Sequence, residues 1–250
     1  MIIDTHTHLT DPSRRDNAMR YTKEEYFGVL DEHGVDLVWT SAVAGLYATG
    51  DYPASNRFMY EFFKGEEKRI VPFFTVNPNY GDTVLEEIKR CVEEYNFRGL
   101  KLHPWLQSFH ISMPIVDRII EQCIRYNIPL IFHDGTPPYS STLQIANLAE
   151  RYPEAIVILG HAGLCESYAE AIRAAKRLEN IYLCLCGPSI SQLQIIVDNV
   201  DPSRLLFGTD YTGPPNHAAL RYRIEMWKYI NISAETRDKV FFKNALALLT

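Results

Sequence analysis

The sequence predicts an α/β protein, a single (β/α)8 TIM barrel that spans residues 1–250. Short β-rich apolar segments alternate with longer amphipathic stretches, and this alternation repeats eight times without a composition break that would mark a linker. Strands that alternate with helices imply right-handed crossovers and a parallel sheet. The length of 250 residues is about that of one such barrel, so closure of the sheet is the expected outcome.

Eight strands are expected, beginning near residues 2–6, 35–39, 70–74, 99–103, 129–133, 155–159, 181–184 and 205–208. An open, doubly wound sheet is the alternative arrangement of such units. It is disfavoured because the Gly-x-Gly-x-x-Gly pattern typical of dinucleotide-binding sheets does not follow the first strand.

The segments between the strands carry signals for helix starts and ends. Residues 22–25, Thr-Lys-Glu-Glu, form a capping-box pattern. Three more capping candidates lie near predicted helix starts: Asp82, Asp117 and Ser191. Helices are expected to end at 33–34, 127–129 and 151–153, where a C-cap residue or a proline precedes the next strand.

Composition narrows the class of partner. A net charge of −6 without a basic face argues against nucleic acid, because phosphate binding needs clustered lysines and arginines. The start of the chain has no basic leader and no apolar run approaches the roughly 18 residues that span a bilayer, so a cytoplasmic protein without membrane contact is expected. Five scattered cysteines fit a reducing compartment. The expected partners are a small-molecule substrate and, as an open alternative, a second copy of the chain in a homodimer.

Histidines mark the ends of the predicted strands. His6 and His8 end the first strand and Asp210 ends the eighth; His103, His133 and His161 end the fourth, fifth and sixth. Parallel strands of a barrel all point the same way, so these side chains are expected on one rim.

His6 and His8 share a face of their strand because side chains alternate with period two. The pair can therefore chelate one ion. A catalytic site for zinc or a neighbouring metal needs about three protein ligands and an open position. His133 and Asp210 complete the predicted set. Cys184 and Cys186 are a weaker metal signal and are expected to be ordinary residues of the barrel wall.

Several motifs together resemble the amidohydrolase-related group, which includes aminocarboxymuconate-semialdehyde decarboxylase. They are Asp-Thr-His-Thr-His at 4–8, Gly-Leu-Lys-Leu-His-Pro at 99–104, Gly-His-Ala-Gly at 160–163, Phe-Gly-Thr-Asp at 207–210 and Lys-Asn-Ala-Leu-Ala-Leu-Leu at 243–249. The resemblance covers nearly the whole chain. It implies that His6, His8, His133 and Asp210 hold one divalent ion, zinc with manganese as the alternative, beside a catalytic His161.

Two features complicate the resemblance. Many relatives have an acidic residue and a serine where Cys184 and Cys186 stand, which removes a source of polar support. In binuclear members a strand-four lysine is carboxylated and bridges two metals. We expect Lys101 to be an ordinary lysine instead, paired with a carboxylate or with the substrate.

The site suggests three functions. The first is a hydrolase that acts on a small amide, ester or lactone, in which Asp210 moves the proton and His161 hydrogen-bonds the oxyanion. The second is a non-oxidative decarboxylase of an unsaturated or aromatic carboxylic acid, in which Asp210 or His161 protonates the carbon. The third is a barrel that binds a metal or ligand without catalysis. Asp4 is expected either to orient an imidazole or to tie down its strand.

Substrate contacts are expected from the mouth of the barrel. Lys101 and His103 point to the same side of their strand and should line the pocket. The loops after the strands add further candidates: Arg14, Arg15, Trp105, Gln107, Tyr139 and Tyr211.

Overall fold

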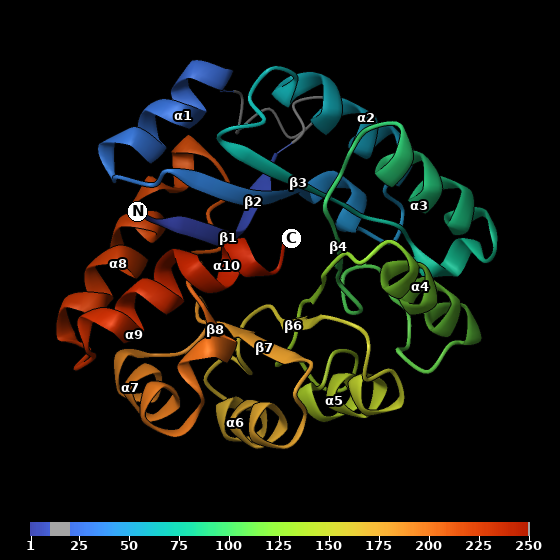
Figure 1. The fold of residues 1–250 in the computed structure, drawn as a ribbon. Helices are drawn as coiled ribbons and strands as arrows, with labels where there is room; N and C mark the ends of the chain where they lie inside the picture. The colour runs from blue at the N-terminus through green and yellow to red at the C-terminus, as the bar shows by residue number, and fades with distance from the viewer. Residues whose placement is uncertain (11–20, 250) are drawn as a thin grey trace.

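The computed structural model describes residues 1–10 and 21–249. Eight parallel strands form one sheet in the order of the chain, and helices surround it (Figure 1). The strands are β1 (Ile3–Leu9), β2 (Leu37–Ala42), β3 (Ile70–Phe74), β4 (Gly99–Leu102), β5 (Leu130–Phe132), β6 (Val157–Leu159), β7 (Ile181–Cys184) and β8 (Leu205–Leu206). The predicted (β/α)8 barrel is confirmed.

The outer helices follow their strands in turn. They are α1 (Lys23–Glu32), α2 (Tyr52–Phe63), α3 (Thr83–Glu93), α4 (Pro114–Arg125), α5 (Thr142–Arg151), α6 (Tyr168–Arg177), α7 (Ile190–Asn199) and α8 (His217–Met226). Two short helices, α9 (Ala234–Asp238) and α10 (Asn244–Ala247), complete the chain. Within the described residues, no helix is both long and apolar enough to cross a membrane.

The barrel closes where β1 meets the chain after β8. Thr5 N donates a hydrogen bond to Phe207 O over 3.0 Å, and Asp210 N donates to His6 O over 2.8 Å. A parallel bridge joins Thr7 to Tyr211. Because of this closure, the backbone that carries Asp210 is fixed against the strand that carries His6.

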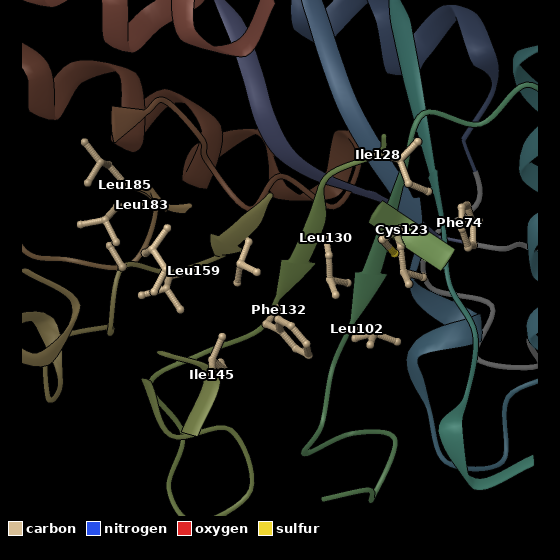
Figure 2. Packing of buried hydrophobic residues seen from close by; sticks show 14 of the residues in the cluster. Phe74, Leu102, Cys123, Ile128, Leu130, Phe132, Ile145, Leu159, Leu183 and Leu185 are labelled. Atoms are coloured by element: carbon tan, nitrogen blue, oxygen red, sulfur yellow. The ribbon is translucent and has the colours of Figure 1, made fainter. Parts of the chain in front are cut away.

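Side chains of the strands alternate between two cores. Leu102 and Phe132 point outward and pack under the helices (Figure 2), and Leu100 belongs to the same cluster. Lys101 and Ile131 lie between them in sequence and belong to the barrel interior, where Ile131 joins a second cluster with Trp39 and Phe73. Ala245 and Leu248 contact the same inner cluster. The alternation thus sends every second residue of a strand toward the barrel axis, as its period of two requires.

The helix ends match the expected capping residues in part. Thr22 and Glu25 form the predicted capping box of α1, which ends at His33 before Gly34 with φ 68°. Asp82 stands at the N-cap position of α3 without a side-chain capping hydrogen bond, and Asp117 lies in the first turn of α4, whose N-cap residue is Met113. For α7 the capping residue is Ser189, which forms a box with Gln192, rather than the predicted Ser191.

Gly99 permits the close packing of the barrel interior. A Cβ at this position would lie 2.2 Å from Phe73 Cε1, and the Phe73 ring is itself stacked on Trp39 with centroids 5.1 Å apart. Gly99→Ala is therefore expected to lower the free energy of unfolding by about 1–3 kcal/mol, the usual cost of overpacking. Urea denaturation measures the change.

Gly28→Ala is the matched control for this prediction. Gly28 lies within α1, and nothing is within 4 Å of a Cβ built there. This substitution should leave the stability unchanged or raise it by up to about 1 kcal/mol, since alanine restricts the unfolded chain. Equal stabilities for the two variants would contradict the packing argument.

Candidate active site

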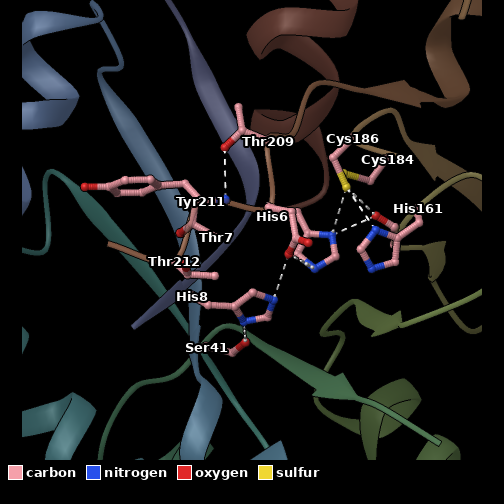
Figure 3. Close-up of polar contacts among 12 residues, drawn as sticks. His6, Thr7, His8, Ser41, His161, Cys184, Cys186, Thr209, Tyr211 and Thr212 are labelled. Atoms are coloured by element: carbon pink, nitrogen blue, oxygen red, sulfur yellow. Dashed lines mark hydrogen bonds and ion pairs between the residues drawn. The ribbon is translucent and has the colours of Figure 1, made fainter. Parts of the chain in front are cut away.

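The predicted rim residues converge at the carboxyl ends of the strands. Their imidazole rings form a row in which His8 and His6 centroids lie 5.1 Å apart and His6 and His161 lie 4.7 Å apart (Figure 3). His161 is 4.4 Å from His133, and His133 stacks on His103 at 3.8 Å. All of these rings except the partly buried His133 are at most 8% exposed. Residues from four strands are thus packed into one cluster.

His6 has a defined tautomer. Its Nδ1 lies 2.7 Å from Gly160 O, and a carbonyl oxygen only accepts hydrogen bonds, so Nδ1 carries the proton. The lone pair of Nε2 then faces the cluster, where Lys101 Nζ donates to it over 2.8 Å. An imidazole whose Nδ1–H is held by a carbonyl is a common metal ligand, because its basic Nε2 is both oriented and free.

His8 and Asp210 complete a compact group with His6. Asp210 Oδ1 lies 3.7 Å from His6 Nε2 and 3.2 Å from His8 Nε2. His8 Nδ1 is 3.0 Å from Ser41 Oγ. The serine hydroxyl can donate or accept, so His8 can present Nε2 as a lone pair to a metal or as an N–H to Asp210.

One ligand atom from each of His6, His8 and Asp210 lies within 4.8 Å of the other two. Two imidazole nitrogens and a carboxylate oxygen are ligands that suit zinc and manganese, so the residues present fit a divalent ion. A candidate metal site therefore stands where His6, His8 and Asp210 meet.

Asp210 is held in an unusual backbone conformation. Its φ of 61° lies in the left-handed region, which aspartate tolerates better than most residues, and its carboxylate is 44% exposed. Desolvation acts to raise the pKa of Asp210. The hydrogen bond with His8 and the nearby His161 outweigh that effect and hold the pKa well below the usual range of a carboxyl. Asp210 is therefore a carboxylate at neutral pH.

Lys101 is the buried cation of the site. Its side chain on β4 is 2% exposed, and burial lowers its pKa from the ordinary value. Among the described residues, no carboxylate oxygen lies within 4.0 Å of its Nζ, so the expected pairing with a protein carboxylate is not found in that part of the chain. Its partner is instead His6, a candidate metal ligand.

His133 lies outside the compact group of three. Its Nε2 is 2.8 Å from Thr136 Oγ1. The hydrogen bond and the stacking on His103 hold the ring next to His161, with the two ring centroids 4.4 Å apart. As the fourth ligand, His133 stays a proposal.

Asp134 positions the catalytic candidate His161, a role that the sequence analysis missed. Its two carboxylate oxygens accept from His161 N over 2.6 Å and from Gly163 N over 2.7 Å. Burial raises the pKa of Asp134 to about 6, and these hydrogen bonds oppose the rise. The sequence feature that could have indicated this role is an acidic residue directly after the end of the fifth strand.

Asp4 ties the first strand to the eighth rather than orienting an imidazole. One carboxylate oxygen accepts from His6 N over 3.1 Å and from Thr209 N over 3.0 Å, and the other accepts from Thr209 Oγ1. Burial raises its pKa to about 7. The second of the two expected roles is the one that these contacts support.

The structure corrects two of the expected substrate contacts. Gln107 is fully buried, and its side chain bonds His103 N and Val76 O, so it braces the loop after β4. Tyr211 is fully buried and packs on Tyr26 with ring centroids 5.5 Å apart, outside the barrel. Neither side chain has a surface for substrate.

Of the other expected substrate contacts, four lie in the described part of the chain and two lie outside it. Trp105 and Tyr139 are about half exposed on their loops, at 50% and 47%. Lys101 and His103 lie in the cluster as predicted from strand alternation. Arg14 and Arg15 lie outside the described residues.

Comparisons with known proteins place the chain in a family. The Amidohydro_2 model, described as amidohydrolase, matches residues 3–250. Significant matches are lacking among the sequences of curated proteins. Three solved structures illustrate the likeness of fold, and each is less than 20% identical to this chain.

A 2,6-dihydroxybenzoate decarboxylase from Rhizobium is 17% identical with a TM-score of 0.79, covering 99% of this chain and 98% of the other. A dihydroxybenzoic acid decarboxylase from Polaromonas sp. JS666, with bound manganese and 2-nitroresorcinol, is 17% identical with a TM-score of 0.79 over 99% and 96%. A 4-oxalomesaconate hydratase from Rhodopseudomonas palustris is 18% identical with a TM-score of 0.71 over 100% and 95%. Because the family model matches residues 3–250, nearly the whole chain, the protein belongs to the amidohydrolase family.

Proposed function

We propose that this protein is a metal-dependent, non-oxidative decarboxylase of a small aromatic or unsaturated carboxylic acid. His6, His8 and Asp210 would hold one zinc or manganese ion, with His133 as a fourth ligand. The observation that carries the proposal is the buried amine of Lys101, which lies 2.8 Å from His6 Nε2. Trp105 and Tyr139, whose side chains are about half exposed, are the candidate substrate contacts from the loops.

The charge of the site favours an anionic substrate. Desolvation is the first cause that keeps His133 and His6 neutral: it lowers the pKa of His133 to about 3 and that of His6 well below the ordinary value. Asp210 is then the carboxylate that balances Lys101. A bound divalent ion would add two positive charges, and a substrate carboxylate would offset one of them.

A metal at His6 Nε2 would compete with Lys101 for the same lone pair. Nζ donates to that nitrogen in this structure, so Lys101 would need another partner if His6 held an ion. A buried ammonium is costly without an anionic partner. A substrate carboxylate would provide that partner and restore the charged form of Lys101.

The names of similar structures agree with this substrate class. One neighbour is a 2,6-dihydroxybenzoate decarboxylase complexed with 2,6-dihydroxybenzoate, and another is a 5-carboxyvanillate decarboxylase from Sphingomonas paucimobilis. Each of these substrates is an aromatic carboxylic acid. The likeness supports the proposal without identifying the substrate of this chain.

The reaction breaks the bond between the carboxylate and its carbon. Carbon dioxide leaves, the electron pair stays on the carbon, and a proton replaces the carboxylate, so no oxidant or reductant is needed. A divalent ion supplies positive charge that binds substrate oxygens and stabilises negative charge. Lys101 orients the carboxylate. Asp210, ionised because of its low pKa, takes a proton from the substrate or solvent and delivers it to the carbon.

This proposal takes the place of the hydrolase expected first from the sequence. A buried ammonium beside the candidate metal ligands can pair with a substrate carboxylate, and a neutral amide, ester or lactone offers no such anionic partner. Asp210 is half-exposed and ionised beside the candidate metal ligands, so it can move a proton, which a non-catalytic barrel would not require.

The test is a direct assay for carbon dioxide. Metal-loaded protein is incubated with a panel of hydroxybenzoates and enoic carboxylic acids, and a parallel panel holds amides, esters and lactones. We expect carbon dioxide and the protonated product from at least one acid. Hydrolysis of a member of the second panel, with no carbon dioxide from the first, would show that the enzyme is a hydrolase.

Lys101→Met tests the proposed carboxylate contact. It removes a charge-assisted hydrogen bond worth about 1.5–3 kcal/mol, so kcat/KM for the carboxylic acid should fall by about 10- to 100-fold while metal content stays near one per chain. Lys89→Met, on the exposed side of α3, is the matched control and should match the unmodified enzyme. An unchanged kcat/KM in Lys101→Met would remove the contact from the proposal.

A further inference from the structure

We infer that Cys186 is a positioning residue that sets the tautomer of His161. The side chain lies just after β7 and is 1% exposed (Figure 3). Sequence reasoning expected an ordinary wall residue at this position. The inference rests on the proposed function only where it assigns a role to His161 in the reaction.

Three polar atoms surround the sulfur of Cys186. Gly160 O lies 3.1 Å away, His161 Nδ1 lies 3.3 Å away and His6 Nδ1 lies 3.6 Å away. Gly160 O also accepts from His6 Nδ1 over 2.7 Å. One carbonyl and one thiol therefore connect the two histidines on the side away from Asp210.

The donors in this group can be assigned from what each atom is able to do. The carbonyl only accepts, so the thiol S–H donates to Gly160 O, its shortest contact. The sulfur then has only lone pairs to offer His161. His161 Nδ1 must carry the proton and donate it to the sulfur, which leaves Nε2 unprotonated.

Burial of the two imidazole rings strengthens the preference for this tautomer. His6 is 2% exposed and His161 is 5% exposed, so water competes little for these ring nitrogens. Sulfur is a weak acceptor, but leaving the Nδ1–H unpaired in this buried environment would be less favourable still. Cys186 thus favours one tautomer.

The tautomer divides the work between the two catalytic candidates. A neutral His161 with a bare Nε2 accepts a hydrogen bond from a substrate hydroxyl or water and does not donate one. Nε2 could deliver a proton to carbon only after taking one up, as could the Asp210 carboxylate, and the proposed reaction uses Asp210. The sequence had left this choice between Asp210 and His161 open.

Cys184 provides a matched control two residues earlier. It is fully buried, belongs to the same inner cluster as Cys186 and accepts from Thr5 Oγ1 at 3.6 Å. Cys184→Ala and Cys186→Ala remove the same atom from the same face of one strand segment. They differ in that the contact with His161 Nδ1 belongs to Cys186.

The experiment measures the tautomer in metal-free protein by long-range ¹H–¹⁵N NMR of the histidine rings. A His161→Asn spectrum assigns the His161 signals. We expect a protonated Nδ1 and an unprotonated Nε2 in the unmodified protein, in Cys184→Ala and in Cys186→Ser, whose hydroxyl also donates and accepts. In Cys186→Ala the Nδ1–H to Nε2–H ratio should fall about fivefold or more.

A protonated Nε2 on His161 in the unmodified protein, or an unchanged ratio in Cys186→Ala, would overturn the inference. The unmodified protein gives a decisive result even if a variant fails to fold. Turnover of a carboxylic acid is the second measurement, with kcat lowered in Cys186→Ala and restored in Cys186→Ser. If the NMR result is as expected but the unmodified enzyme releases no carbon dioxide, the proposed function fails while the tautomer assignment stands.

Discussion

The His6→Ala, His8→Ala double variant is expected to lose its divalent metal, with affinity at least about 100-fold weaker than that of the unmodified protein. Loss of a single residue that merely supports a metal ligand already costs about 10- to 100-fold. Here both imidazole nitrogens that face Asp210 are removed, and a lone half-exposed carboxylate remains from the group of three. Elemental analysis of protein purified without chelators, followed by titration with a competing chelator, measures the loss.

His217→Ala is the control for histidine removal in general. His217 is exposed at the start of α8, and its Nδ1 contacts Pro214 O. Its metal content should stay near one ion per chain. Full metal binding by the double variant, or full activity of a rigorously metal-free preparation, would contradict the metal assignment.

Asp210→Asn should keep its metal and lose turnover. Asparagine nearly preserves shape, tolerates the left-handed φ of 61° and retains an oxygen that can face the ion. It cannot carry the proton, and removal of a general acid or base typically costs about 10²–10⁴-fold in rate. We expect metal content near one per chain with kcat lowered at least about 100-fold.

Metal content and kcat must be measured on the same preparation. Asp198→Asn, on the surface of α7, is the matched control and should leave both quantities unchanged. Nearly normal turnover in Asp210→Asn would move proton delivery to His161.

The periodic features of this protein could be predicted from its sequence. Alternation with period two places Lys101 toward the barrel axis and its neighbours Leu100 and Leu102 under the helices, as the structure has them. The capping box at Thr22 and Glu25 is equally local. Because parallel strands end on one rim, strand positions alone were enough to bring the predicted histidines into one cluster.

The partners of each side chain were decided by tertiary structure. Gln107 and Tyr211 follow strands that end at the site, yet one braces a loop and the other packs outside the barrel. Sequence position places a residue near the rim but does not say which way a loop residue turns.

The contacts that define the chemistry join distant parts of the chain. Gly160 O meets His6 across 154 positions, and Cys186 meets His161 across 25. Periodicity constrains the face on which a side chain lies. The hydrogen bonds that choose a tautomer or hold a carboxylate ionised depend on distances of about 3 Å between strands, which only the closed barrel sets.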